Sequence, residues 1–142
     1  MECNIYQSVK SLGVPKKKIR EVVSLVYKSC KKDNPIVSIH FIGDKKMRSI
    51  NKKYRNKDSS TDVLSFAIKE GEYSLDSNEW GDIFISIPYI KAQAKRVKVV
   101  YKEELFRMLI HGTLHLVGHD HTKPKEAKKM FTLQEAILKK VI

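Results

Sequence analysis

The sequence predicts an α+β fold, in which one mixed β-sheet of about four strands packs against about five helices. Two observations predict this class. Apolar residues recur at helical spacing in several long segments, whereas shorter segments rich in isoleucine, valine and phenylalanine are typical of strands. These segments follow the order helix, strand, helix, two strands and three helices, and a short strand is expected before them near Asn4–Gln7.

The first helix is expected to begin at Pro15, because proline suits the first helical position, where no amide donor is needed. Its apolar stripe consists of Ile19, Val22, Val23, Val26 and Cys30. The pair Asn34-Pro35 ends this helix. The next segment, Ile36–Ile42, has apolar residues on both faces and is typical of a strand.

Gly43 and Asp44 offer a turn and an N-cap for a second helix. The apolar side chains of this helix are Met47, Ile50 and Tyr54. A polar loop from Arg55 to Thr61 then leads into a strand over Asp62–Ile68. Residues 69–79 are typical of an acidic surface turn.

The last strand is expected over Gly81–Ile87, and Pro88 ends it and begins a helix that runs to about Val97. The following helix, Glu103–Val117, has a core stripe of Leu105, Met108, Leu109, Gly112 and Leu116. Thr122 and Pro124 begin the final helix. It packs through Ala127, Met130, Leu133, Ile137 and Val141.

The 142 residues are 42% hydrophobic and contain no repeat or low-complexity linker, so we expect a single domain over residues 1–142. No apolar run reaches the length of a membrane span, and the polar start of the chain is not typical of a signal peptide. Cys3 and Cys30 are too few for a disulfide framework. We therefore expect a cytoplasmic protein with no membrane partner.

The net charge of +12 suggests a polyanionic partner, although 23 lysines against 5 arginines are also typical of a solvated surface. The charge is unevenly distributed. Seven basic residues fall between Lys45 and Lys57, whereas the segment from Glu70 to Asp82 is acidic. Arg55 lies within the most basic stretch.

Four of the five histidines lie between His111 and His121. His111 and His115 are four residues apart, so they share a helix face and can bind one metal ion from one side. His119 would continue this stripe, but eight helical residues advance about 12 Å, whereas two nitrogens on one zinc ion are only about 4 Å apart. Gly118 can end the helix and return His121 toward the pair. The sequence therefore predicts one zinc ion at the C-terminal helices, held by His111, His115 and His121 with an open fourth position.

Metzincin peptidases share the pattern H-E-x-x-H-x-x-G-x-x-H, and this chain matches its histidines and its glycine. Gly112 stands where those peptidases have the glutamate that takes a proton from the metal-bound water. Peptide hydrolysis is therefore not expected. The open position could still hold a water whose pKa falls from about 15.7 toward about 7.

Cleavage of a phosphodiester builds negative charge on the phosphate oxygens, so a cation near the metal matters more than a carboxylate. Arginine suits this task because its planar, permanently charged fork can bind two phosphate oxygens. Arg55 is the candidate catalytic residue, and Arg55, Lys57 and Ser65 are the residues expected to bind substrate. From the residues alone, Arg55 could equally be a surface arginine that caps the end of a helix.

Three segments carry a combined pattern. They are His111-Gly-Thr-Leu-His-Leu-Val-Gly-His-Asp-His121, Tyr54-Arg-Asn-Lys-Asp-Ser-Ser-Thr-Asp-Val-Leu-Ser-Phe66 and Gly81-Asp-Ile. Together they resemble the YbeY endoribonuclease family, in the family's order, over the chain from about Ile36 to its end. The glycine after the first histidine separates the histidine segment from peptidases, and the arginine segment is an independent second signature.

The resemblance implies a metal-dependent endoribonuclease that is specific for single-stranded RNA. It implies a role in the 3′-end maturation of small-subunit (16S) ribosomal RNA and in ribosome quality control, with the small ribosomal subunit or its proteins as partners. Carried over residue by residue, the zinc ligands fall on His111, His115 and His121, and the family's functional arginine falls on Arg55.

The chain departs from the family pattern at three positions. Ser60 and Ala67 stand where prolines are usual, so the loop lacks the rigidity that proline confers. His119 stands where tyrosine is frequent. This histidine is either a proton shuttle or a substitution without a role, and the second interpretation is favoured.

Other functions remain open on the residues. A non-catalytic ribosome assembly factor would use zinc only to hold the C-terminal helices, with a basic surface that binds RNA. Structural zinc sites normally have four protein ligands, so Asp120 or His119 as a fourth ligand would favour this alternative. A metallopeptidase is the third hypothesis, and the histidines could also merely fill and cap a helix end.

Overall fold

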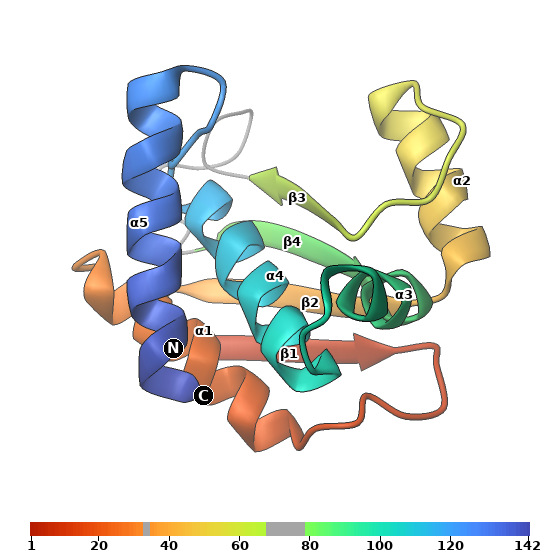
Figure 1. The fold of residues 1–142 in the computed structure, drawn as a ribbon, viewed down its shortest axis with the longest axis horizontal. Coiled ribbons are helices and arrows are strands. Elements are labelled where there is room, and N and C mark those ends of the chain that lie inside the picture. The colour runs from red at the N-terminus through yellow and green to blue at the C-terminus, as the bar shows by residue number, and fades with distance from the viewer. Residues whose placement is uncertain (33–34, 68–78) are drawn as a thin grey trace.

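A computed structural model describes residues 1–32, 35–67 and 79–142 of the chain (Figure 1). Its strands are β1 (Glu2–Gln7), β2 (Ile36–Ile42), β3 (Val63–Ala67) and β4 (Glu79–Ser86). They form a four-stranded sheet in the order β1-β2-β4-β3. β2 pairs in parallel with β1 and β4, whereas β3 pairs antiparallel with β4 and lies at an edge. The sheet is mixed, as the sequence predicts.

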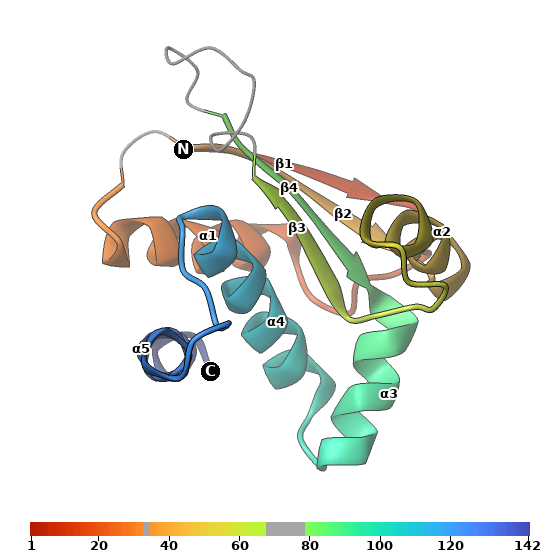
Figure 2. The ribbon, with the colours of Figure 1, turned by 90° about the horizontal axis from the view of Figure 1, so that it is seen from above.

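The helices lie on both sides of this sheet. They are α1 (Lys16–Ser29), α2 (Asp44–Arg55), α3 (Ile87–Val97), α4 (Tyr101–Leu116) and α5 (Pro124–Val141). Figure 2 shows α2 on one side of the sheet and the other helices on the opposite side, where α4 packs against α1, α3 and α5. The α+β class is therefore confirmed, with five helices among the described residues. No helix in those residues has the length and hydropathy needed to cross a membrane.

The core lies between the sheet and α4. Val37, Ile39 and Phe41 of β2 and Ile83 and Ile85 of β4 alternate along their strands and are fully buried. From α4, the buried apolar side chains are Leu105, Phe106, Leu109, Ile110, Leu114 and Leu116. Each such side chain contributes about 1.5–3 kcal/mol on burial. The helix that carries two of the histidines is thus firmly anchored.

Gly112 lets α4 approach the sheet closely. A Cβ atom at this position would lie 3.0 Å from Cγ2 of Val63 and 3.1 Å from both Cγ2 of Ile83 and Oγ of Ser65. Any larger residue at this position would require these neighbouring side chains to shift by a few tenths of an ångström. The residue that stands where peptidases have their glutamate base therefore serves here to pack the helix against the sheet.

The beginning of α2 differs from the prediction. Gly43, and not Asp44, is the N-cap residue, and no side chain caps the helix. The carboxylate of Asp44 instead accepts hydrogen bonds from the hydroxyls of Ser60 and Ser86, each at 2.7 Å. Asp44 therefore ties the loop after α2 to the end of β4. Ser60 stands where the family pattern usually has proline, and it holds the loop through this hydrogen bond instead of through a rigid ring.

Several other boundaries also differ from the prediction. Pro15 occupies the N-cap of α1, and the helix begins at Lys16. β4 ends at Ser86, whose hydroxyl accepts a hydrogen bond from the amide of Tyr89 and thereby caps α3. α4 begins at Tyr101, before the expected Glu103. Ile68 and the acidic turn up to residue 78 lie outside the described residues.

Candidate metal centre and its pocket

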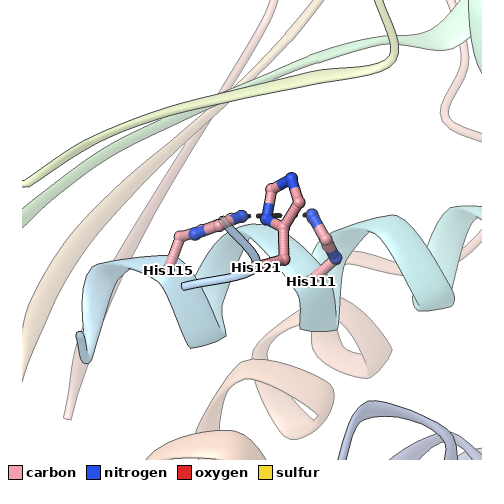
Figure 3. Close-up of side chains that lie close together, drawn as sticks. All are labelled: His111, His115 and His121. Carbon is pink, nitrogen blue, oxygen red and sulfur yellow. Dashed lines mark hydrogen bonds between the residues drawn. The ribbon is translucent and has the colours of Figure 1, made fainter. Parts of the chain in front are cut away.

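Three histidines come together where α4 ends. His111 and His115 extend from one face of α4, and His121 returns over them from the segment between α4 and α5 (Figure 3). Each offers one ring nitrogen, and these nitrogens lie within 4.8 Å of one another. Two nitrogens on one zinc ion are at most about 4 Å apart, so a closure of roughly 1 Å would complete the cluster. His121 is exposed and has room for this movement.

Gly118 allows the chain to reverse after α4. Its φ of 101° lies in the region that side chains other than glycine rarely adopt. The amide of Gly118 donates to the carbonyl of His115, and the amide of His119 donates to that of Leu114, at 3.1 and 3.0 Å. These two hydrogen bonds form a Schellman motif, which ends the helix and turns the chain back. His121 rather than His119 joins the pair, as the helical rise predicts.

Hydrogen bonds on Nδ1 set the tautomer of two of the rings. Nδ1 of His111 lies 2.7 Å from Oε1 of Gln134, and Nδ1 of His115 lies 2.9 Å from the carbonyl oxygen of His119. Both partners are acceptors, so each neutral ring carries its proton on Nδ1 and keeps a lone pair on Nε2. Acceptors in this position are typical of metal-binding imidazoles.

The two Nε2 atoms of His111 and His115 face each other at 3.2 Å. With no proton on either atom, the contact is repulsive, and a cation between the rings would make it favourable. Burial lowers the pKa of His115 to about 4, and it also lowers the pKa of His111. Both rings are therefore neutral near pH 7, as metal ligands must be. The residues present fit a zinc ion.

The turn after α4 uses its other polar groups internally. The carboxylate of Asp120 accepts hydrogen bonds from the amides of His121 and Thr122, at 2.7 and 3.2 Å, and from the Thr122 hydroxyl at 3.0 Å. His119 contributes its backbone carbonyl to His115, and burial lowers the pKa of its own ring. Among the described residues, neither Asp120 nor His119 joins the cluster as a fourth ligand.

The histidines line a pocket of about 700 Å³. The edge strand β3 contributes Val63–Ala67 to its lining, Asp62 precedes them, and Arg55 from the end of α2 lies beside them. Elements that are far apart in the sequence therefore meet around one space. The pocket brings a cationic side chain and a candidate metal site within reach of the same ligand.

Arg55 is held against β3 by two contacts. Its Nη2 donates to the carbonyl oxygen of Ser65 at 2.9 Å, and its guanidinium lies over the ring of Phe66, 4.5 Å from the centroid. An arginine has five N–H groups, and this is its one hydrogen bond among the described residues. Other N–H groups are therefore available for an anion in the pocket.

The other two residues expected at the substrate differ in position. Ser65 lines the pocket, but its hydroxyl donates to the carbonyl oxygen of Gly112 at 3.0 Å and so joins β3 to α4. Lys57 is exposed and does not belong to the described pocket lining. Its backbone amide donates to the carbonyl of Asn51 after the end of α2.

Two residues of α5 near the site were missed by sequence reasoning. Gln134 is only 4% exposed and accepts a hydrogen bond from His111. In the sequence it is a polar residue within the apolar stripe of α5, and this interruption of the stripe could have indicated a buried polar contact. Phe131 is exposed, and its ring centroid lies 6.1 Å from that of His111 and 6.2 Å from that of His121. No spacing in the sequence indicates the position of Phe131.

Gln134 is itself held by charged neighbours. Its Nε2 donates to Oε2 of Glu135 at 3.1 Å, which leaves Oε1 directed at His111. Glu135 receives two hydrogen bonds from Arg107, each 3.1 Å long, and Arg107 also pairs with the buried Glu104 at 2.7 Å. This network joins α5 to α4 behind the metal site.

Comparisons with known proteins agree with this geometry. The family model described as Endoribonuclease YbeY matches residues 4–142 of the chain. A protein of that name from Persephonella marina is 41% identical over 136 residues, which cover 93% of this chain and 89% of the relative. Another, from a Sulfurihydrogenibium species, is 39% identical over 141 residues, which cover 96% and 90%. A solution structure of a Thermotoga maritima protein has a similar fold, with a TM-score of 0.67, 23% identity and coverage of 98% of this chain and 88% of its own.

Proposed function

Because this chain belongs to the YbeY endoribonuclease family and is thus a metal-dependent hydrolase of RNA, we propose that it uses zinc to cut single-stranded RNA. We propose that its substrate is the 3′ region of small-subunit (16S) ribosomal RNA, which it cuts in maturation and in ribosome quality control. The small ribosomal subunit or its proteins are then its partners. We take residues 1–142 as one catalytic domain, because the family match spans nearly all of it.

The observation that carries the zinc assignment is the convergence of three histidine nitrogens within 4.8 Å of one another, with the Nε2 atoms of His111 and His115 3.2 Å apart. His111, His115 and His121 would hold the ion, and all three line the pocket that Arg55 and β3 also line. A zinc ion bound there would act as a Lewis acid toward a phosphate oxygen or a water molecule. Three protein ligands with an open position are typical of catalytic zinc sites.

Arg55 is the proposed catalytic cation. Its contacts with Ser65 and Phe66 fix the guanidinium on the pocket wall before substrate binds. A preorganised cation at this place stabilises the negative charge that develops on the phosphate during cleavage. Arg55 also binds the phosphate in the ground state, since its fork can donate two hydrogen bonds to one phosphate. Ser65 contributes by positioning β3 against α4 through its bond to Gly112.

A purely structural zinc site is less compatible with this arrangement. Such a site would use a fourth protein ligand, and the carboxylate of Asp120 is engaged within its own turn. A peptidase is also less compatible with this arrangement, because glycine stands at position 112, where metzincin peptidases have their glutamate base, and a Cβ there would lie 3.0 Å from Val63.

The test is cleavage of a labelled single-stranded RNA by the zinc-loaded protein, with the same RNA annealed to its complement as the duplex control. We expect cleavage of the single strand only, its loss in His115→Ala, and its retention in His40→Ala, a histidine outside the cluster. A wild-type rate no greater than that of His115→Ala would refute the nuclease assignment. Cleavage of free RNA without cleavage at the mature 3′ end of small-subunit particles would refute only the maturation role.

A further inference from the structure

Phe66 links the pocket to a second surface. Val63 and Ser65 of β3 lie against α4, because both approach Gly112. Successive side chains of a strand point to opposite faces, so Phe66 points to the other side of the sheet, where α2 lies. There its ring meets the ring of Tyr54 edge to face, with 5.4 Å between centroids. The residue that lines the pocket beside Arg55 therefore also supports Tyr54.

Tyr54 has the features of a ring that is available to a partner. Its side chain is 56% exposed, at the end of a helix that is otherwise strongly polar. The Nζ atom of Lys53 lies 5.2 Å from the centroid of its ring. An aromatic ring that is supported on one edge and open elsewhere can stack on a flat ligand at a low cost in conformational entropy.

The surroundings of Tyr54 are positively charged. Between residues 45 and 57 the basic side chains are Lys45, Lys46, Arg48, Lys52, Lys53, Arg55 and Lys57. Among the described residues, only Arg48 and Lys52 pair with a carboxylate, and both share Asp58. Of the others, Lys53 lies over the ring of Tyr54 and Arg55 over the ring of Phe66, and neither pairs with a carboxylate among the described residues, so both can attract an anionic partner.

A second exposed tyrosine, Tyr6, lies on the same side of the sheet but differs from Tyr54 in its charged neighbours. Tyr6 of β1 is 53% exposed and stacks on His40, with 5.0 Å between centroids. His40 in turn contacts the carboxylate of Asp82 at 2.8 Å. Tyr6 thus stacks on a ring that is paired with a carboxylate, whereas Tyr54 lies beside the ammonium group of Lys53, and Tyr6 lies on the opposite edge strand from β3.

We propose that Tyr54, supported by Phe66 and flanked by Lys53, is a stacking site for an unpaired base of the RNA segment that extends out of the pocket past Arg55. This inference rests on the proposed function, because it takes single-stranded RNA as the substrate. Bases of a duplex are stacked on each other, so only a single strand can place a base on the ring. Lys53 contacts the phosphate of the same segment.

The test measures binding without cleavage. The metal-free protein in EDTA is titrated into a fluorescent single-stranded RNA of about 12 nucleotides, and the affinity is followed as a function of salt. In Tyr54→Ala we expect affinity to fall roughly 5- to 30-fold with an unchanged salt slope, because stacking releases no counterions. Tyr54→Trp should retain the wild-type affinity. In Lys53→Ala the slope of log K against log salt should fall by about 0.7, the value for one phosphate contact.

Tyr6→Ala is the matched control, because the residue type is the same and the exposure is similar, 53% against 56%. We expect its affinity to stay within about twofold of wild type. Tyr54→Ala binding within twofold of wild type would overturn the stacking site, as would equal losses in Tyr6→Ala. An equal loss for duplex RNA would also overturn it. If wild type with zinc fails to cut RNA while Tyr54→Ala still loses affinity, the proposed function fails and the stacking site stands.

Discussion

Oε1 of Gln134 on α5 accepts a hydrogen bond from Nδ1 of His111 on α4 at 2.7 Å. This one contact determines which nitrogen of His111 keeps a lone pair. The packing of α5 on α4 is therefore part of the candidate metal site, although α5 contributes none of the three histidines of the cluster.

Gln134→Met should weaken zinc binding by roughly 10- to 100-fold, because the side chain keeps its size and loses the acceptor that orients His111. Competition with a chelator of known affinity measures this change. The matched control is Gln7→Met, which removes an exposed glutamine that donates to the carbonyls of Val9 and Lys10, outside the network that holds Gln134. Equal zinc affinities for wild type and Gln134→Met would show that the bond has no orienting role.

Removal of zinc should lower both activity and stability. At a free zinc concentration of 100 times its dissociation constant, one site that exists only in the folded state adds about 2.7 kcal/mol to the free energy of unfolding. We expect EDTA to abolish this gain in wild type and in His40→Ala, and we expect no gain in His111→Ala. Thermal unfolding with and without zinc measures this gain in stability. A zinc-dependent shift that persists in His111→Ala would place the ion elsewhere.

Arg55→Lys should reduce the rate of RNA cleavage by roughly 100-fold, because lysine keeps the charge but cannot provide a planar fork. The zinc affinity should remain that of wild type, since Arg55 contacts β3 and none of the histidines. The control is Arg48→Lys on the same helix, where the arginine pairs with the exposed Asp58. Similar cleavage rates in Arg55→Lys and wild type would contradict the catalytic role.

Gly112→Ala should destabilise the fold by about 1–3 kcal/mol, because the added methyl group overpacks the contact of α4 with Val63 and Ile83. Gly43→Ala serves as a comparison, since a Cβ there meets no atom within 4 Å and any loss of stability reports only the N-cap preference for glycine over alanine. Urea unfolding of both variants measures the difference. A Gly112→Ala variant as stable as wild type would mean that the helix adjusts without cost.

Cys3 should react slowly with thiol reagents in the folded protein. Burial raises the pKa of its thiol to about 11, so only about one molecule in a thousand carries the reactive thiolate at pH 8. Burial also raises the pKa of Cys30. Labelling with iodoacetamide, followed by mass spectrometry, should be much slower before unfolding in urea than after it. Fast labelling of Cys3 in the folded protein would contradict its burial.

Much of the fold follows from local patterns. The helical stripes and the apolar strands are periodic within one element, so they are visible without knowledge of neighbours. The boundaries were less predictable, because they depend on contacts between elements. Asp44 resembles an N-cap in the sequence, and it binds Ser60 and Ser86 instead because the end of β4 lies beside it. Ser86 likewise ends β4 by capping α3.

The sequence by itself determined the histidine cluster, because helical rise and a glycine turn are local properties of the segment His111–His121. Tertiary structure alone decided what surrounds it. Arg55 reaches the same pocket because the loop after α2 places β3 antiparallel to β4, at the edge of the sheet beside α4. Gln134 meets His111 only because α5 packs on α4. These are contacts between separate elements, and no spacing along the chain encodes them.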